Sequence, residues 1–515
     1  MLPALVLLSL VAVPALAGLL AFAIRADGPR RFLLVATALA HGGLTAWAWM
    51  VRPSPILGEW IGLDGPGLFF LAVTSALFLA AAVYGVGFLR REASSAPAGE
   101  HGGGVSAVLG NASEAVFTGC LLLFLATMSL VTLSHHFGLL WVAVEATTLA
   151  SAPLIYYHRH TRSLEATWKY LLVCSVGIAL ALLGNFFLAV AASKPSGDRI
   201  PLILSELLGE GRALHLPWLK AAFLLFLVGY GTKMGLAPLH TWLPDAHSEA
   251  PSVVSALLSG ALLNCAFLGI LRAEQVCIAA GQAPFAQDLL VVFGLLSMGV
   301  AGVFILGQPD YKRLLAYSSV EHMGILSLGV GLGGAGAAGS FLHALNHSLA
   351  KAMLFFVAGN ILAAYGTKTV ANVRGLVRTM PATGILWVAG FLAITGSPPF
   401  GLFLSEVTIL KAALDDGRIL VAVLYLLFLA LIFVGMASVF LRMAQGSPPK
   451  PIGTAEPIGT AMPIGTAEPR TPRESFLCVF PPAVFCVLVL VLGLYVPPGL
   501  KEAIEAAARV VGGGR

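Results

Sequence analysis

The fold is decided by residues 233–260, KMGLAPLHTWLPDAHSEAPSVVSALLSG, where a long apolar helix is interrupted. A second interrupted stretch follows at residues 394–414, ITGSPPFGLFLSEVTILKAAL. The residues that break the helices are Gly235, Pro238 and Pro244 in the first stretch, and Gly396, Pro398, Pro399 and Gly401 in the second. Proline removes a backbone N–H and blocks the hydrogen bond to the carbonyl four residues earlier. Broken helices at membrane depth are tolerated where they line a cavity or are buried in protein, so both stretches predict the interior of a polytopic membrane protein.

The composition favours the same class. The chain has 515 residues, of which 58% are hydrophobic and only 11% charged, whereas a typical soluble domain has about 25% charged residues. This composition excludes a water-soluble globule, a nucleic-acid binder and a disulfide-stapled secreted domain. The six cysteines lie in or beside apolar runs without zinc or iron–sulfur spacing, so we expect no metal site and no other cofactor.

The chain offers about fourteen apolar runs of the roughly 20 residues that a spanning helix needs. They lie at residues 2–24, 31–51, 66–88, 115–134, 137–157, 167–192, 218–236, 251–271, 286–307, 313–333, 339–364, 383–413, 418–443 and 476–496. We therefore predict an all-α polytopic membrane protein in which the seventh and twelfth helices are broken. Loops after odd-numbered runs carry about twice as many Lys and Arg residues as the other loops. This bias predicts a multi-pass protein of the inner (cytoplasmic) membrane with both termini outside.

The runs divide the chain into four regions. Residues 1–114 contain three helices and a loop, residues 115–272 and 286–445 contain five helices each, and residues 446–515 contain a flexible linker and one last helix. The two five-helix regions share a weak pattern, in which KYLLVCSVG begins at Lys169 and KAMLFFVAG begins at Lys351. We predict two inverted repeats, because an odd number of helices reverses the direction of the second copy.

Several ionisable side chains fall inside the apolar runs, although a charge at membrane depth costs about 3 kcal/mol or more. They are Glu145, Lys169, Lys233, Glu321, His322, His343, His347, Lys351 and Glu406. His343, His347 and Lys351 are spaced four residues apart and share one helix face. Lys169 and Glu321 lie near helix ends and can reach the surface, and a lone Glu or Lys can form a structural ion pair. The set as a whole predicts a proton path, since buried Lys and Glu exchange protons near neutral pH more readily than exposed ones.

Three motifs of this chain resemble the antiporter-like proton-translocating subunits of respiratory complex I and their Mrp-antiporter relatives. They are the stretch at 233–260, QPDYKRLLAYSSVEHMG at 308–324 and HALNHSLAKAMLFF at 343–356. The resemblance extends over roughly residues 65–445. Within it, LLWVAVEATTLAS at 139–151 and EATWKYLLVCSVGIALAL at 165–182 are most similar to component F of hydrogenase-4 and formate hydrogenlyase.

The resemblance implies roles for the buried charges. Glu145 matches an acid that pairs with Lys233 on the first broken helix, and opening of that pair would gate proton movement. Lys169 matches a lysine found in several members. His343, His347 and Lys351 match a His/Lys face that links two half-channels. Glu406 matches the terminal residue of the second broken helix. Many members carry a central Lys or His on the eighth helix, where this chain offers Ser259 and Asn264. The path there either uses water between these side chains or is interrupted.

The resemblance thus implies a proton-translocating subunit of a membrane-bound hydrogenase or complex I-like oxidoreductase, which couples redox energy to proton movement. Its expected partners are other membrane subunits, peripheral redox subunits, the lipid bilayer and protons, or Na⁺. Two alternatives remain, a Na⁺(K⁺)/H⁺ antiporter subunit of the Mrp type and a non-conducting membrane anchor. The chain has no Rossmann glycine fingerprint, P-loop or cluster-binding cysteine set, so we expect no redox centre and no catalytic residue in it.

Overall fold

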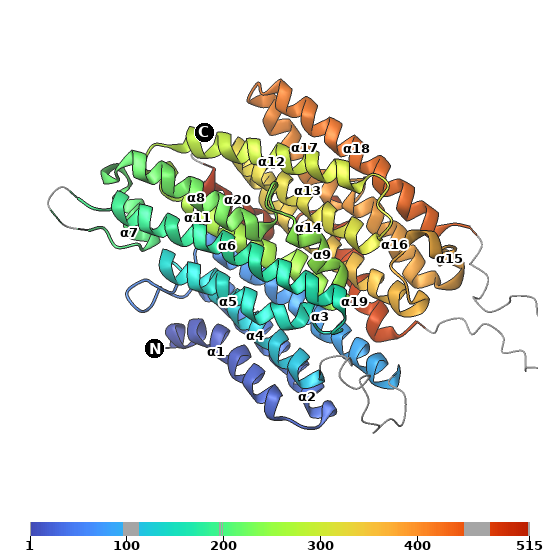
Figure 1. The fold of residues 1–515 in the computed structure, drawn as a ribbon. Coiled ribbons are helices and arrows are strands. Elements are labelled where there is room, and N and C mark those ends of the chain that lie inside the picture. Colours follow the sequence, from blue (N-terminus) through green and yellow to red (C-terminus); the bar gives the residue numbers. More distant parts are fainter. Residues whose placement is uncertain (1, 96–112, 195–196, 198, 447–473, 513–515) are drawn as a thin grey trace, which may run out of the picture.

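A computed structural model of the protein describes residues 2–95, 113–194, 197, 199–446 and 474–512. Every regular element within these residues is a helix, which confirms the all-α prediction. Figure 1 shows the helices side by side in one bundle, with α1 and α2 at one edge and α18 at the opposite edge. The elements are α1 (Leu2–Ala23), α2 (Asp27–Val51), α3 (Gly65–Ser95), α4 (Glu114–Leu133), α5 (Phe137–Ile155), α6 (Thr161–Ala191), α7 (Leu204–Gly209), η2 (Gly211–Ala213), α8 (Leu216–Met234), α9 (Trp242–Glu249), α10 (Ser252–Leu257), η3 (Leu258–Leu262), α11 (Leu263–Ala279), α12 (Ala283–Ile305), α13 (Tyr311–Leu332), α14 (Gly334–Tyr365), η4 (Val370–Asn372), α15 (Leu376–Thr379), α16 (Pro381–Ile394), α17 (Gly401–Asp415), α18 (Ile419–Ala444), α19 (Phe476–Leu494) and α20 (Pro498–Val511).

Eleven helical spans among the described residues are long and apolar enough to cross a membrane, so the chain is a multi-pass integral membrane protein. One of them, Ser252–Ala279, consists of α10, η3 and α11 end to end. Three of the predicted runs correspond to elements outside the eleven, namely α8, α13 and the pair α16–α17. The exact count of 14 spans stays a prediction.

Both predicted helix breaks are present. The first separates α8 from α9, and Gly235 caps the end of α8 in the left-handed conformation at φ +87°. The second separates α16 from α17, and Gly396 there has φ +60°. Pro238 and Pro399 lie inside the two breaks. Pro244, by contrast, does not interrupt a helix: it lies in the first turn of α9, where the missing N–H needs no helical partner.

The centre of the bundle is formed by α14 and by the span α10–η3–α11. That span is buried, and α14 packs against α10, α13, α16, α17 and α19. Leu258–Leu262 form a turn of π-helix inside the span, a local widening that is frequent at functional sites. The polar side chains of these central helices are therefore enclosed by other helices.

The C-terminal region contains one helix more than predicted. The expected last span is α19, which packs against α3, α14, α16 and α17, and the additional helix is α20. One face of α20 is apolar and buried through Ile504, Ala507 and Val511, whereas Lys501 and Glu502 on the other face are exposed. Residues 447–473, the predicted flexible linker, lie outside the described residues, and so does most of the predicted loop at 92–114. Residues 92–95 continue α3.

A buried arginine connects α11 to the loop before α3. The Arg272 guanidinium donates to Asp64 Oδ1 at 2.9 Å, to the Thr132 carbonyl at 2.9 Å and to the carbonyls of Val131 and Ser134. Burial raises the pKa of Asp64, but the charges and hydrogen bonds of Arg272 and His135 together lower it by more, so the pKa of Asp64 is well below its ordinary value. Arg272 thereby joins the first three helices to the first five-helix region.

Replacing Asp64 by Asn should destabilise the protein, because it leaves the Arg272 charge buried without a counter-charge. Removing one member of a buried ion pair costs about 3–5 kcal/mol. The matched control is Asp288→Asn, which removes an acid that is 65% exposed and pairs with Arg418, and such surface pairs contribute about 0–1 kcal/mol. Thermal unfolding of the purified protein in detergent should show a clearly lower midpoint for Asp64→Asn alone. Equal midpoints for the two variants would contradict the role given to Arg272.

Candidate functional site

Lys233 lies in the last turn of α8 and has no exposed surface. Its Nζ donates hydrogen bonds to Thr148 Oγ1 at 2.8 Å and to Tyr170 OH at 2.6 Å. The same nitrogen lies 4.4 Å from the centre of the Tyr170 ring, whose face attracts a cation. The C-terminal end of α8 adds a favourable dipole. Two hydroxyl groups, a ring and a helix end therefore stabilise this buried amine.

Glu145 on α5 is connected to Lys233 through Thr148. The Thr148 hydroxyl donates to Glu145 Oε2 at 3.1 Å and accepts from Lys233 Nζ, since a hydroxyl has one donor and two acceptor positions. The other Glu145 oxygen accepts from Ser175, an exposed residue of α6, at 3.0 Å. Glu145 is therefore half-buried and has an exposed partner. Among the ion pairs of the described residues none joins Glu145 to Lys233 directly, so the implied pair is bridged by a hydroxyl.

Lys169 lies apart from this cluster. Its side chain is 47% exposed and pairs with Glu165 at 2.7 Å and with Asp245 at 3.0 Å. Lys169 is close to the start of α6, and a long lysine side chain at such a position can extend to the polar surface. Its position does not match the place in a buried path that the resemblance implied, so we leave it out of the path.

His247 on α9 belongs to the site, and the sequence analysis missed it. The residue is fully buried, and neither ring nitrogen is hydrogen-bonded to another side chain among the described residues. Its ring centre lies 6.2 Å from that of Trp242 and 5.6 Å from that of Phe355. Lys233 Nζ lies 6.0 Å from the Trp242 ring on one side, and Lys351 is close enough to interact electrostatically on the other. The position of His247 just after the first helix break was the sequence signal that could have identified it.

Three histidines lie together where α13 packs against α14. His322 Nδ1 and His343 Nε2 are 2.9 Å apart, and the ring centres of His322 and His347 are 4.9 Å apart. His343 Nδ1 also lies 2.9 Å from Ser405 Oγ on α17. All three histidines are fully buried. The two histidines of α14 are therefore joined by His322, which lies outside the set of residues matched by the resemblance.

Lys351 lies one turn beyond His347 on α14. It is fully buried, and its Nζ donates to the Leu315 carbonyl at 2.7 Å. Glu321 of α13 interacts electrostatically with it. The amine thus lies between His247 on the side of the first break and the three histidines on the side of the second.

Glu406 lies on α17, directly after the second break, and is 7% exposed. Its carboxylate rests against Gly396, because a side chain at that position would overlap Glu406 Oε2. One oxygen of Glu406 has no protein partner among the described residues. The ligand atoms of His322, His343 and Glu406 lie within 4.8 Å of one another. This group can share a proton, and its spacing also suits a single cation.

Ser259 and Asn264 connect the π-helical segment to the second region. The Ser259 and Ser319 hydroxyls lie 2.8 Å apart, and Asn264 Nδ2 donates to Ser348 Oγ at 2.9 Å. Ser319 belongs to α13 and Ser348 to α14, the helices that carry the histidines. The two residues proposed for the central link are thus buried contacts between the two five-helix regions, and Asn264 Oδ1 has no protein partner among the described residues.

These features define a polytopic membrane protein with two broken helices and a charged interior. A family model described as NADH:quinone oxidoreductase/Mrp antiporter, TM, matches residues 134–433. The match includes both breaks and every ionisable residue of the candidate site. The chain belongs to this family, which confirms the resemblance of its motifs.

Known proteins agree with this assignment. The chain is 38% identical over 377 residues to a hydrogenase-4 component F homolog from Methylacidiphilum infernorum, covering 73% of this chain and 75% of that one. It is 30% identical over 382 residues to hydrogenase-4 component B of Escherichia coli, covering 71% of this chain and 52% of that one. Among solved structures, a chain of the Mrp complex from Dietzia sp. has a TM-score of 0.83 at 22% identity over 99% of this chain and 98% of that one. A chain of respiratory complex I from Thermus thermophilus has a TM-score of 0.72 at 23% identity over 97% and 99%, so the fold is shared.

Replacing Gly396 by Ala should destabilise the second break, because the new side chain would be strained at φ +60° and would overlap the Glu406 carboxylate. Strain of this kind costs about 1–3 kcal/mol. Gly499→Ala is the control, since nothing lies within 4 Å of its added carbon. Thermal unfolding in detergent should show a lower midpoint for Gly396→Ala and partial recovery when Glu406→Ala is added. Equal midpoints for Gly396→Ala and Gly499→Ala would contradict this contact.

Proposed function

We propose that this chain moves protons across the membrane as one subunit of a membrane-bound hydrogenase or complex I-like oxidoreductase. Its similarity to proteins named as hydrogenase-4 components F and B supports the hydrogenase-type assembly. The redox chemistry is assigned to peripheral subunits, and the membrane neighbours to other subunits of the same complex. The inner membrane, with both termini outside, is the proposed location.

The observation that carries this proposal is the buried series of ionisable side chains through the centre of the bundle. It begins at Glu145 and Lys233, continues through His247 and Lys351, and ends at Glu406, with three histidines before the last position. Each buried ionisable group costs free energy, and a buried ion pair is weak evidence for stability. A series of this length is therefore better explained by proton transfer than by stability.

The geometry near Lys233 supports a gate. A proton can pass from Lys233 Nζ to the Thr148 oxygen while the Thr148 hydroxyl proton passes to Glu145 Oε2. This transfer leaves a neutral amine and a neutral acid and moves no heavy atom far. Because Glu145 is only half-buried, a change in a neighbouring subunit can alter its charge and thereby the proton affinity of Lys233.

The predicted inverted repeats over residues 115–272 and 286–445 complete this proposal. Each region contains one helix break followed by a short or shortened helix, α9 in the first and α17 in the second. A key ionisable residue lies beside each break, Lys233 before the first and Glu406 after the second. Matching interrupted helices in two halves are typical of transport sites. The polar contacts of Ser259 and Asn264 are the proposed crossing between the two halves.

A second candidate function is cation/proton antiport. The observation that favours it is the group formed by His322, His343 and Glu406, whose ligand atoms lie within 4.8 Å of one another. Two imidazoles and a carboxylate at this spacing can hold a cation in one state and a proton in another. The shared fold with a chain of an Mrp complex is compatible with either function.

Lys233→Met and Glu406→Gln should each reduce proton translocation by about 100-fold, in line with the contribution of a positioned proton carrier. Thr148→Val should cause a smaller loss and Thr148→Ser should restore activity, since only Ser keeps the bridging hydroxyl. Mass spectrometry of the natively purified complex identifies its partners and hence its electron donor. Acridine-dye quenching in everted vesicles then measures donor-driven proton uptake. Lys411→Met, which removes a lysine that is 72% exposed, is the control.

If the Lys233 and Glu406 variants remain in the complex and translocate protons at the unaltered rate, the proton path is wrong and a non-conducting anchor is favoured instead. A result in which only Lys411→Met is inactive would contradict the proposal in the same way.

Proton uptake should be independent of Na⁺ and K⁺ if the chain carries protons alone. The measurement is the recovery of dye fluorescence after NaCl or KCl is added to energised vesicles, with choline chloride as the control salt. A cation-dependent recovery that is lost in His343→Gln would instead support antiport at the His322, His343 and Glu406 group.

A further inference from the structure

A charged pocket opens on the surface beside α9. It has a volume of about 400 Å³. We call it the α9 pocket, and its walls include Lys169, Asp245, Glu249, Asp310, Arg313 and Thr369. The walls come from α6, α9, the start of α13 and the segment before η4, so the pocket lies where the two five-helix regions meet.

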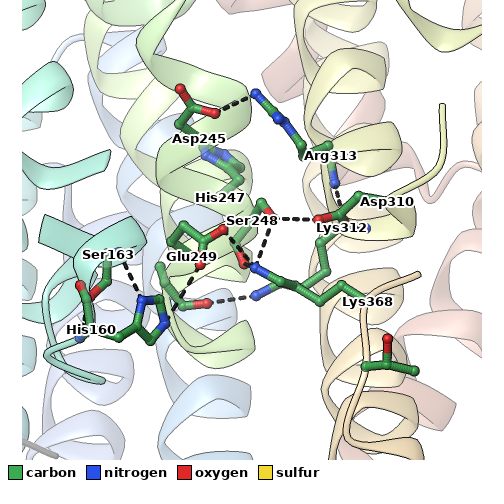
Figure 2. Close-up of polar contacts among 12 residues, drawn as sticks. His160, Ser163, Asp245, His247, Ser248, Glu249, Asp310, Lys312, Arg313 and Lys368 are labelled. Atoms are coloured by element: carbon green, nitrogen blue, oxygen red, sulfur yellow. Dashed lines mark hydrogen bonds and ion pairs between the residues drawn. The ribbon is translucent and has the colours of Figure 1, made fainter. Parts of the chain in front are cut away.

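The short helix α9 separates this pocket from the buried path. Asp245 and Glu249 are four residues apart and share one face, and Figure 2 shows Asp245 with Arg313 and Glu249 with Lys368. Asp245 pairs with Lys169 and Arg313. Glu249 pairs with Lys368 at 2.7 Å. Between them in the sequence, His247 is fully buried, so one short helix has a polar face on the pocket and an imidazole in the interior.

Lys312 lies at the inner end of this polar network. It is 1% exposed, and its Nζ donates to the Ala250 carbonyl, just after α9, at 2.6 Å. Its neighbours Asp310 and Arg313 line the pocket, and Figure 2 shows both residues beside Lys312. His247 interacts electrostatically with both Lys312 and Lys351. Lys312 is therefore a buried amine that adjoins two pocket-lining residues in the sequence and is coupled to His247 of the buried series.

From this placement we propose that the α9 pocket is a proton entrance and that Lys312 is the first buried proton acceptor, which passes the proton to His247. The inference rests on the proposed function, because it supplies protons to the same buried series. It adds a residue and a direction of entry that neither the buried series nor the two helix breaks require.

The transfer needs no group other than water and the two side chains. A hydronium ion in the pocket gives its proton to the neutral Lys312 amine and becomes water. The resulting ammonium then gives a proton to a ring nitrogen of His247 and returns to the neutral amine. A neutral imidazole has one nitrogen that can accept a proton and one N–H that can release a proton, and neither His247 nitrogen is bonded to another side chain among the described residues, so the ring can take the proton from Lys312 and release one towards Lys351.

The charges around Lys312 support this role. Lys312 precedes the predicted span at 313–333, and burial together with the charge of Lys368 lowers its pKa to about 7, while Asp310 and Glu249 act in the opposite direction. His158 and His247 also interact electrostatically with it. An amine with a pKa near the ambient pH exists in both protonation states, as a proton carrier must.

The test replaces Lys312 by Arg and by Met in the assembled complex. Arg keeps the positive charge but cannot release a proton in a protein, so a structural role tolerates Lys312→Arg whereas a carrier role does not. Donor-driven proton uptake in everted vesicles should fall by about tenfold or more in both variants, while both remain in the purified complex. Lys411→Met is again the exposed control.

The outcomes distinguish failure of the proposed entrance from failure of the proposed function. Loss of proton uptake in Lys233→Met together with unaltered uptake in Lys312→Arg would overturn the entrance and leave the function intact. Unaltered uptake in Lys233→Met as well would overturn both. If Lys312→Arg does not assemble, Lys312→Gln, which keeps a donor for the Ala250 carbonyl, takes its place with the same expectation.

Access of water to the pocket can be measured independently of activity. Thr369 lines the pocket and is exposed, so Thr369→Cys should react with a membrane-impermeant maleimide added to the intact complex on one side of the membrane. Val176→Cys on α6, which is 64% exposed on an apolar surface, is the control and should stay unlabelled. Protection of Thr369→Cys in the complex would show that a neighbouring subunit covers the pocket, and this would overturn the entrance.

Discussion

A lysine without exposed surface determines how the interior of this protein is organised. The Lys233 amine is stabilised by two hydroxyl groups, an aromatic face and a helix C-terminus, and its nearest acid is one hydroxyl away. The helix break beside Lys233 is what brings these groups together, since it frees the end of α8 within the bundle.

The same principle connects the other parts of the structure. The helices that follow the breaks carry the functional side chains His247 and Glu406. In a continuous helix, side chains at these positions would face lipid or pack against neighbouring helices. In α9 this produces one face in contact with surface charges and another that holds His247. In α17 it brings Glu406 to the histidines of α13 and α14. The breaks thus place His247 and Glu406 in the interior, beside the buried polar groups of the continuous helices α13 and α14.

The sequence was sufficient for the helical class, both breaks and most of the buried charges, because prolines, glycines and charges are conspicuous in apolar runs. It could not identify Thr148 and Tyr170 as the partners of Lys233, since a threonine and a tyrosine in a membrane helix have no distinctive pattern. For Lys169 the sequence left a place in the path and a place at the surface both open, because spacing alone does not say whether a long side chain points inward or outward; the structure has it 47% exposed. The helix α20 was missed because it is shorter than a spanning helix and contains charged as well as apolar residues.

The π-helical segment Leu258–Leu262 has a consequence for how the two halves meet. Side chains five positions apart, such as those of Ser259 and Asn264, would point about 140° apart on an ordinary α-helix. A π turn bonds each residue to the fifth one along, so it brings these two side chains nearly into line, towards α13 and α14. The contacts of Ser259 with α13 and of Asn264 with α14 therefore depend on the winding of the backbone. If the same residues formed a uniform α-helix, one of these two side chains would point away from α13 and α14.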